Sequence, residues 1–304
     1  MSDPLLIVAG LVTGLLVGMT GMGGGSLMTP ILIFLFNFNP AMAIGTDILH
    51  GAIFKSFGGI RHRRLRTVRA RLAGWMLLGS APASLLGVWT ATYLTDRYGD
   101  TVDSVQGQVL GYTLLFGSAA FVAKALLRKS GPAASLGQLS TRDRVVAVSI
   151  GLVGGFIVGL TSVGSGTLFA LAMLLSFPLA AKVVVGTDIA HASALLWVAG
   201  IGHLVAGNVD LHAISWLLVG SIPGVLVGSQ VSVGLPETTL RFSLAAILAL
   251  SGLKLLDVPY ANALVIFSLG LGLAALVVWG ILLVLRRPTP APGGSPPTGA
   301  APGP

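Results

Sequence analysis

Two pairs of acidic and imidazole side chains have the types and spacing to carry out chemistry. Asp47 and His50 occur in the motif Gly-Thr-Asp-Ile-x-His, and Asp188 and His191 occur in a second copy of it. Residues three apart lie on one face of a helix, and acidic residues deep in an apolar segment usually mark an ion pathway or a relay. We predict a relay for protons at these four residues, with Na⁺ as an alternative ion. A structural alternative is that the polar groups cap helices that begin later.

Two glycine-rich runs, which we call the first and second knots, precede short apolar segments at 20–26 and 161–167. Glycine interrupts helices and lets backbone approach a ligand closely. The helix that follows begins with free N–H groups and a positive dipole end, which bind oxyanions. Close helix packing through small residues is the alternative. The predicted substrate-binding residues are Thr20, Gly23, Gly24, Gly25, Ser26, Thr161, Gly164, Ser165, Gly166 and Thr167.

Both motifs belong to a longer internal duplication. Residues 10–88 align with residues 151–229 without a gap, at an offset of 141. Two copies of a broken membrane segment are a common plan of secondary transporters, with the binding site where the copies meet. We therefore predict an all-α polytopic membrane protein of two inverted-topology repeats, each of about five segments, with short broken helices at the knots.

The composition supports a membrane protein. Apolar residues make up 54% of the chain and charged residues 9%, whereas soluble domains carry roughly 25% charge. The net charge of +8 does not indicate a nucleic-acid partner, because most basic residues flank apolar segments. The chain has no cysteine, which excludes disulfides. We expect the lipid bilayer as a partner and neither a cofactor nor a metal, and the oligomeric state stays open.

The apolar pattern predicts eleven segments. A full crossing needs about 20 residues, so four segments that flank the knots are expected to be short, as half-helices or re-entrant hairpins: 4–19, 26–37, 143–161 and 166–179. The predicted domains are a first transmembrane repeat at 1–130, a cytoplasmic linker at 131–143, a second repeat with an extra C-terminal helix at 144–287, and a disordered tail at 288–304.

Basic residues predict the orientation. Six arginines lie between Arg61 and Arg71, after the third segment, whereas the matching loop at 202–213 has neither Lys nor Arg. By the positive-inside rule the first loop is cytoplasmic and the second is outside. The copies would therefore lie in opposite orientations in the cytoplasmic (inner) membrane, with the N-terminus outside and the C-terminus in the cytoplasm.

Four further basic or imidazole side chains occur near these segments. Lys55 lies inside the third segment without a repeat counterpart, and it is able to pair with an anion or with an aspartate. Lys182 begins the eighth segment, where snorkelling to the interface is favoured. His62 and His203 lie near segment ends, so we expect them at the membrane interface.

The knots, the two Gly-Thr-Asp triplets and the two Gly-Ser-x-Pro turns resemble the sulfite exporter TauE/SafE family, also described as the toluene-sulfonate uptake permease family. The resemblance covers the chain to about residue 286. It implies membrane transport of small sulfur-containing anions, such as sulfite, sulfoacetate or related organosulfonates, with substrate contacts at both knots. Ser165 interrupts the second glycine triplet, so the two half-sites need not bind alike.

The favoured hypothesis is a secondary transporter that exports a small sulfur-containing oxyanion, such as sulfite or an organosulfonate, with proton coupling. A passive anion channel is the first alternative, since it shares the anion site and needs no coupling group. A membrane enzyme, such as a lipid phosphatase, is less favoured. That chemistry needs a nucleophile with a base or a metal cluster, and the knots adjoin no such motif.

Overall fold

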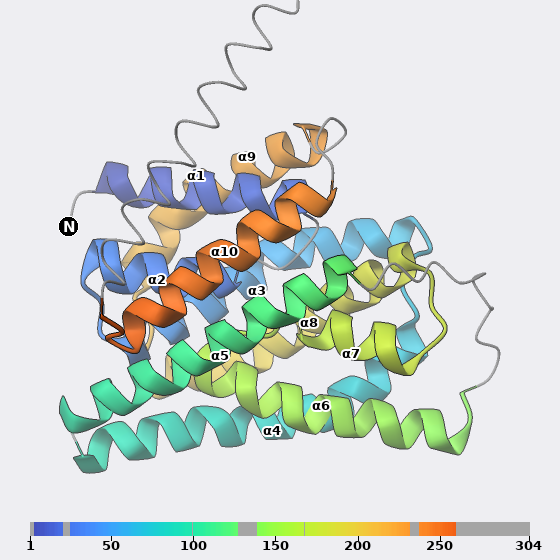
Figure 1. Ribbon diagram of the computed structural model, residues 1–304, viewed down its shortest axis with the longest axis horizontal. Coiled ribbons are helices and arrows are strands. Elements are labelled where there is room, and N and C mark those ends of the chain that lie inside the picture. The colour runs from blue at the N-terminus through green and yellow to red at the C-terminus, as the bar shows by residue number, and fades with distance from the viewer. Residues whose placement is uncertain are drawn as a thin grey trace, which may run out of the picture. The chain divides into compact units, whose positions relative to one another are not determined.

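The computed structural model describes residues 3–20, 25–98, 100–126, 139–166, 168–231 and 237–259, and this part of the chain forms helices without any strand (Figure 1). The predicted eleventh segment at 261–286, the tail, most of the linker and the centre of the first knot lie outside the described residues. The helices are α1 (Asp3–Thr20), α2 (Gly25–Phe36), α3 (Pro40–Arg64), α4 (Ala70–Tyr98), α5 (Asp100–Leu126), α6 (Thr141–Thr161), α7 (Leu168–Ser176), α8 (Ala181–Val205), α9 (Leu211–Val231) and α10 (Glu237–Leu255).

Three of the described helices are long and apolar enough to cross a bilayer, within α4, α6 and α8. This confirms the all-α membrane class. The prediction that the sixth segment is short is wrong. Ser140 and Asp143 form a capping box that starts α6 at Thr141, so the helix has 21 residues. The helices after the knots are short as expected, since α2 has 12 residues and α7 has 9.

The helices pair reciprocally between the two copies (Figure 1). The offset of 141 places α1 on α6, α3 on α8 and α4 on α9. In space α1 of the first copy packs along α9 of the second, and α6 of the second copy packs along α4 of the first. The equivalent helices α3 and α8 pack against each other, as do α5 and α10. Two copies related by a pseudo-twofold axis would make this set of contacts.

Glycines at matched positions permit the closest of these helix crossings. A Cβ on Gly14 in α1 would lie 2.3 Å from the backbone oxygen of Ser221 in α9. A Cβ on Gly155 in α6 would lie 2.4 Å from the backbone oxygen of Ser80 in α4. Real side chains do not approach backbone this closely, so both positions require glycine. Close approach through small residues is how membrane helices gain packing energy.

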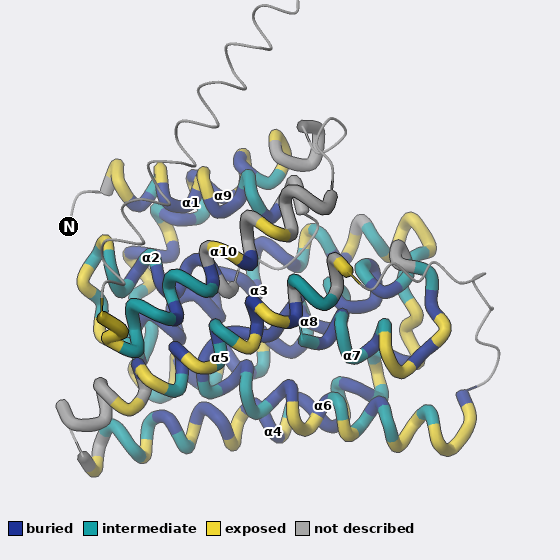
Figure 2. The backbone as a smooth tube through the Cα atoms, in the orientation of Figure 1, coloured by how far each residue is buried: buried dark blue, intermediate teal, exposed yellow. Residues whose placement is uncertain are grey.

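Much of α3 and α8 is buried (Figure 2). Ile44 and Ile48 of α3 and Leu195 and Leu196 of α8 belong to one buried apolar cluster. Large apolar side chains are exposed on the outer helices, among them Leu78, Trp89, Val153 and Val219. An outward apolar face is favourable in lipid, where the interior can instead hold the polar groups.

Candidate functional site

Asp47 lies about two turns into α3, and its side chain is 1% exposed. Two hydroxyl groups from other parts of the chain donate hydrogen bonds to its Oδ2 atom: Thr29 of α2 and Ser162 in the second knot, the latter at 2.7 Å. Buried carboxylates are stable only when donors surround them. Three separate segments therefore converge on this one side chain.

The second knot is a buried, non-helical loop between α6 and α7. Ser162 ends α6 in the left-handed conformation with φ 64°, and its N–H donates to the Val158 oxygen. Gly164 and Gly166 have φ angles of 123° and 108°, which favour glycine. The residues from 161 to 166 are all buried. Within the described residues, no protein group accepts a hydrogen bond from the N–H of Gly164, Ser165 or Gly166.

Buried N–H groups of this kind are rare, because leaving them without an acceptor costs free energy. In a membrane interior the cost is higher still. The second knot thus presents several hydrogen-bond donors in a protected place. An acceptor with several oxygen atoms would satisfy them.

Lys55 adds a positive charge next to this loop. The side chain comes from α3, is 3% exposed, and donates from Nζ to Ser165 Oγ at 2.8 Å. Its ammonium also interacts electrostatically with Asp188 and Asp47. Among the buried residues that the structure describes, it is the one lysine or arginine. The sequence signal for this role is a lysine inside an apolar segment, at a position where the other repeat has Leu196.

The histidines of the two motifs each bond a serine contributed by the other copy. His50 Nε2 shares a hydrogen bond of 2.9 Å with Ser221 Oγ of α9. His191 Nε2 shares one of 2.9 Å with Ser80 Oγ of α4. The offset of 141 converts one pair into the other. Asp188 is likewise buried, with a 3% exposed side chain in α8.

The threonine of each motif holds the start of another helix. Thr46 Oγ1 accepts a hydrogen bond of 3.0 Å from the N–H of Asp210, just before α9. Thr187 Oγ1 accepts one of 3.0 Å from the N–H of Arg69, just before α4. These N–H groups belong to the set that a helix start leaves without an intrahelical partner. The threonines therefore fix the helices that carry Ser221 and Ser80.

The described structure covers the predicted site unevenly. Thr161, Gly164, Ser165 and Gly166 lie in the buried second knot, and the four motif residues Asp47, His50, Asp188 and His191 are buried in α3 and α8. Thr161 Oγ1 donates to Ile157 within its own helix. Gly23, Gly24 and Thr167 lie outside the described residues, and the side chains of Thr20 and Ser26 are not described. Gly25 begins α2.

Of the four further basic or imidazole side chains, Lys55 is described above, and the structure also describes both histidines. His203 is 0% exposed, and its Nε2 atom lies 2.9 Å from the Gly159 oxygen, so the prediction that it is interfacial is wrong. The reason is the crossing of α8 with the end of α6, which sequence position cannot reveal. His62 is half-buried and shares a hydrogen bond with Thr67 Oγ1. The side chain of Lys182 lies outside the described residues.

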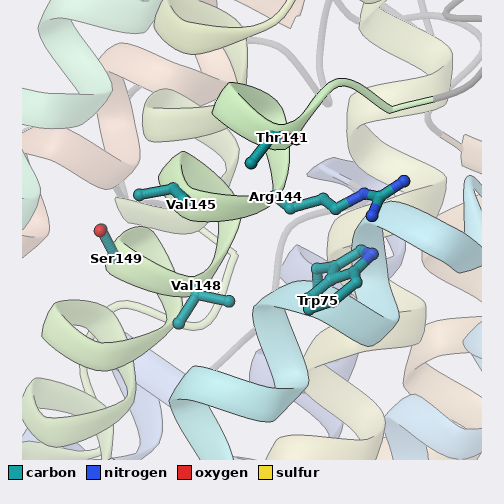
Figure 3. A pocket seen from close by; sticks show the side chains of 6 residues that line it. All are labelled: Trp75, Thr141, Arg144, Val145, Val148 and Ser149. Carbon is teal, nitrogen blue, oxygen red and sulfur yellow. The ribbon is translucent and has the colours of Figure 1, made fainter.

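An open hollow of about 370 Å³ lies between α4 and α6 (Figure 3). The Arg144 guanidinium lies over the Trp75 ring, 5.6 Å from its centroid. The lining shares no residue with the cluster around Asp47 and consists of Trp75, Thr141, Arg144, Val145, Val148 and Ser149. Nor does the described part of the chain bring three His, Cys, Asp or Glu side chains together as metal ligands.

Comparison with known proteins agrees with the membrane class of this chain. The family model described as "Sulfite exporter TauE/SafE" matches residues 6–255. The chain belongs to this family. It is 40% identical over 252 residues to "Probable membrane transporter protein YjnA" of Bacillus subtilis, which covers 83% of this chain and 98% of the relative.

More distant relatives span the same region. "Probable membrane transporter protein YunE" of Bacillus subtilis is 24% identical over 268 residues, covering 84% of this chain and 98% of the relative. "Probable membrane transporter protein MJ0441" of Methanocaldococcus jannaschii is 23% identical over 270 residues, covering 83% and 95%. No solved structure matches the chain. The family and the names of the relatives describe membrane transport, which confirms the prediction of a transporter rather than an enzyme.

Proposed function

We propose that this protein is a secondary transporter that moves a small sulfur-containing oxyanion, sulfite or an organosulfonate, out of the cell across the cytoplasmic membrane. The observation that carries the proposal is the buried second knot, where Lys55 donates to Ser165 beside three N–H groups that have no acceptor among the described residues. Sulfite and sulfonates each have three oxygen atoms with several lone pairs, which is enough to accept from all of these donors. The family of the chain supports sulfur-containing anions as the first class to test.

The charges around the site support coupling to protons. Asp47 and Asp188 together with Lys55 carry a formal charge of −1 when all three are ionised. Adding an anion to such a site in low dielectric is strongly unfavourable. A proton on one carboxylate would remove this repulsion, so protonation of the site would favour anion binding, and the carboxylate would exchange its proton during the transport cycle. Na⁺ bound by the same carboxylates is the other means of compensation.

The two histidines are candidates for the proton path. His50 and His191 each bond a serine through Nε2, and each Nδ1 atom is buried with no hydrogen-bond partner among the described residues. An imidazole with one nitrogen bonded and the other open can exchange a proton while staying in place. We propose that they relay protons to the neighbouring carboxylates.

Alternating access would come from one repeat rocking against the other. The reciprocal packing of α1 on α9 and of α6 on α4 supports two copies related by a pseudo-twofold axis. The basic loop between Arg61 and Arg71 supports a cytoplasmic position for the end of α3. On this proposal the N-terminus is outside and the copies are inverted, which brings the first knot, Thr20 to Ser26, towards the site from the opposite copy.

Reconstitution into vesicles tests the function. Purified protein would be challenged with labelled sulfite, sulfate, methanesulfonate and acetate, with and without an imposed pH gradient, in Na⁺ and in K⁺ buffers. We expect sulfite or methanesulfonate to accumulate, with a dependence on the pH gradient in both buffers. Accumulation that depends on Na⁺ instead would mean that Na⁺ is the coupling ion. The absence of flux for both sulfur anions would contradict the proposal.

The same vesicles separate a carrier from a channel. In a proton-coupled carrier, D47N and D188N should abolish uphill accumulation, because the carboxylate that takes the proton is gone. A passive channel should keep its downhill flux in both variants. The comparison uses equal amounts of folded protein, checked by size-exclusion chromatography in detergent.

A further inference from the structure

We propose that the anion is bound from one side only, with Lys55 as its charged partner and the second knot as its hydrogen-bonding surface. This deepens the proposed function and rests on it. The duplication supplies two knots and two copies of the motif, which would allow two equivalent half-sites. The polar side chains that meet at the site, however, have no polar counterparts at the equivalent positions of the other copy.

The duplication gives a direct comparison of each polar group with its repeat counterpart. At an offset of 141, the polar side chains at the site correspond to positions that have no polar side chain: Lys55 to Leu196, Ser165 to Gly24, Ser162 to Gly21 and Thr29 to Ala170. Each of these four differences leaves the counterpart position without a side-chain donor. By sequence, the counterparts therefore offer neither the ammonium of Lys55 nor the hydroxyls that bind Asp47.

Leu196 is the counterpart of Lys55 in the second copy, and its surroundings show that this position can be apolar. Leu196 is 1% exposed and belongs to the apolar cluster between α3 and α8. Lys55 occupies the equivalent place on α3 but points its Nζ atom at Ser165 of the second knot. A buried lysine is costly unless its charge is compensated. A cation at a position that the fold also accepts as leucine therefore needs a reason other than packing.

Among the described residues, hydrogen-bond donors outnumber acceptors at this place. Lys55 has three donors, and beside it lie the N–H groups of Gly164, Ser165 and Gly166, which have no acceptor within the described residues. Ser165 Oγ accepts from the lysine, and the Ser165 carbonyl oxygen lies 3.5 Å from Nζ. An oxyanion at this place would accept from the ammonium and the loop together. Charge-assisted hydrogen bonds of this kind are short and strong.

A structural explanation would make Lys55 a counter-ion for Asp47 and Asp188 and nothing more. The two explanations differ in what a lysine variant changes. A counter-ion supports folding and the turnover rate, whereas an anion ligand sets the apparent affinity for the anion. The ratio of the effects on KM and kcat therefore decides between them.

The test compares K55M, K55R and K254M for uptake of labelled sulfite and methanesulfonate in vesicles. Lys254 of α10 is the matched control, because its ammonium lies 4.2 Å from the Phe34 ring centroid and not at the knot. We expect K55M to raise KM for both anions about 10- to 100-fold, the loss of a charged hydrogen bond. K55R should retain most of the affinity, and K254M should match the wild type.

A second pair of variants tests the one-sidedness and does not depend on the stability of the lysine variants. S165G makes the second knot resemble the first, and G24S makes the first resemble the second. We expect S165G to raise KM about 2- to 10-fold, as the loss of a neutral hydrogen bond. We expect G24S to leave KM unchanged. Equal effects of both substitutions would show two equivalent half-sites and overturn the proposal.

A third measurement reads occupancy directly. The chain has no cysteine, so S165C introduces a single thiol next to Lys55 and leaves its ammonium in place. Methanesulfonate at saturating concentration should slow the labelling of this thiol by a small cationic reagent, whereas in S56C, the control, it should not. Transport by the wild type with an unchanged KM in K55M, or labelling of S165C that ignores methanesulfonate, would overturn this proposal alone. Absence of transport by the wild type would instead remove the proposed function.

Discussion

The two copies of the Gly-Thr-Asp-Ile-x-His motif show which parts of the duplicated structure stayed alike and which diverged. Both histidines bond a serine of the opposite copy, at the same distance. The carboxylates differ, because the positions that supply Thr29 and Ser162 to Asp47 have no hydroxyl in the other copy. Contacts that hold the helices together are therefore preserved in both copies, while the polar groups at the centre are unequal.

The largest effect is expected where the copies are most alike. Gly14→Leu and Gly155→Leu each force a side chain into the backbone of a crossing helix, at Ser221 and Ser80. We expect each to destabilise the protein by about 3 kcal/mol or more, since overpacking without room costs 1–3 kcal/mol and sometimes exceeds it. Resistance to unfolding by SDS measures the loss.

Gly74→Ala is the control for both glycine variants, because a Cβ at this position meets nothing within 4 Å. It should leave stability unchanged or slightly raised, since alanine favours helix. If one crossing tolerates leucine and the other does not, the two helix pairs are not equivalent.

The next effect is expected where the copies differ. Thr29→Val and Ser162→Ala each remove one donor from Asp47, and we expect uphill transport to fall about tenfold in each variant, the loss of one charge-assisted hydrogen bond. Initial rates in vesicles measure it. Thr13→Val is the matched control, because this buried hydroxyl bonds only the Ala9 oxygen of its own helix. An unchanged rate of uphill transport in both variants would mean that these two hydrogen bonds do not affect the function of Asp47.

A smaller effect should be equal in the two copies. Double-mutant cycles with His50→Gln and Ser221→Ala, and with His191→Gln and Ser80→Ala, should each give a coupling energy of about 1 kcal/mol for one hydrogen bond. Unfolding in SDS supplies the free energies. The mismatched pair of His50 and Ser80 should show no coupling. A coupling energy present in one copy only would mean that one histidine is held by other groups.

The smallest effect is expected at the outer surface. Trp75 lies beneath Arg144, whereas the equivalent Trp216 has the His212 ring as its neighbour, 6.3 Å away. Arg144→Gln should cost about 0.5 kcal/mol, the lower range of an exposed cation–π contact. Arg142→Gln, an exposed neighbour, is the control. A change in anion KM in Arg144→Gln would connect this surface to the transport site, contrary to expectation.

Much of the architecture follows from sequence because its signals are local or repeated. The duplication at an offset of 141 predicts that α3 and α8 are equivalent, and their bounds differ by that number. The length of α6 was mispredicted, because a capping box at Ser140 extends the helix beyond its apolar stretch. His203 was misplaced for a different reason, since its burial against Gly159 comes from a helix crossing far away in sequence.

By itself the sequence determined the membrane class, the duplication, the two motifs and the second knot as a break in the helix, because composition, periodicity and glycine act over a few residues. Only the tertiary structure decided which side chains meet there. The bonds from Lys55 to Ser165 and from Ser162 to Asp47 span more than a hundred residues. Such contacts depend on how α3 packs against the end of α6, and no local property of the chain encodes that packing.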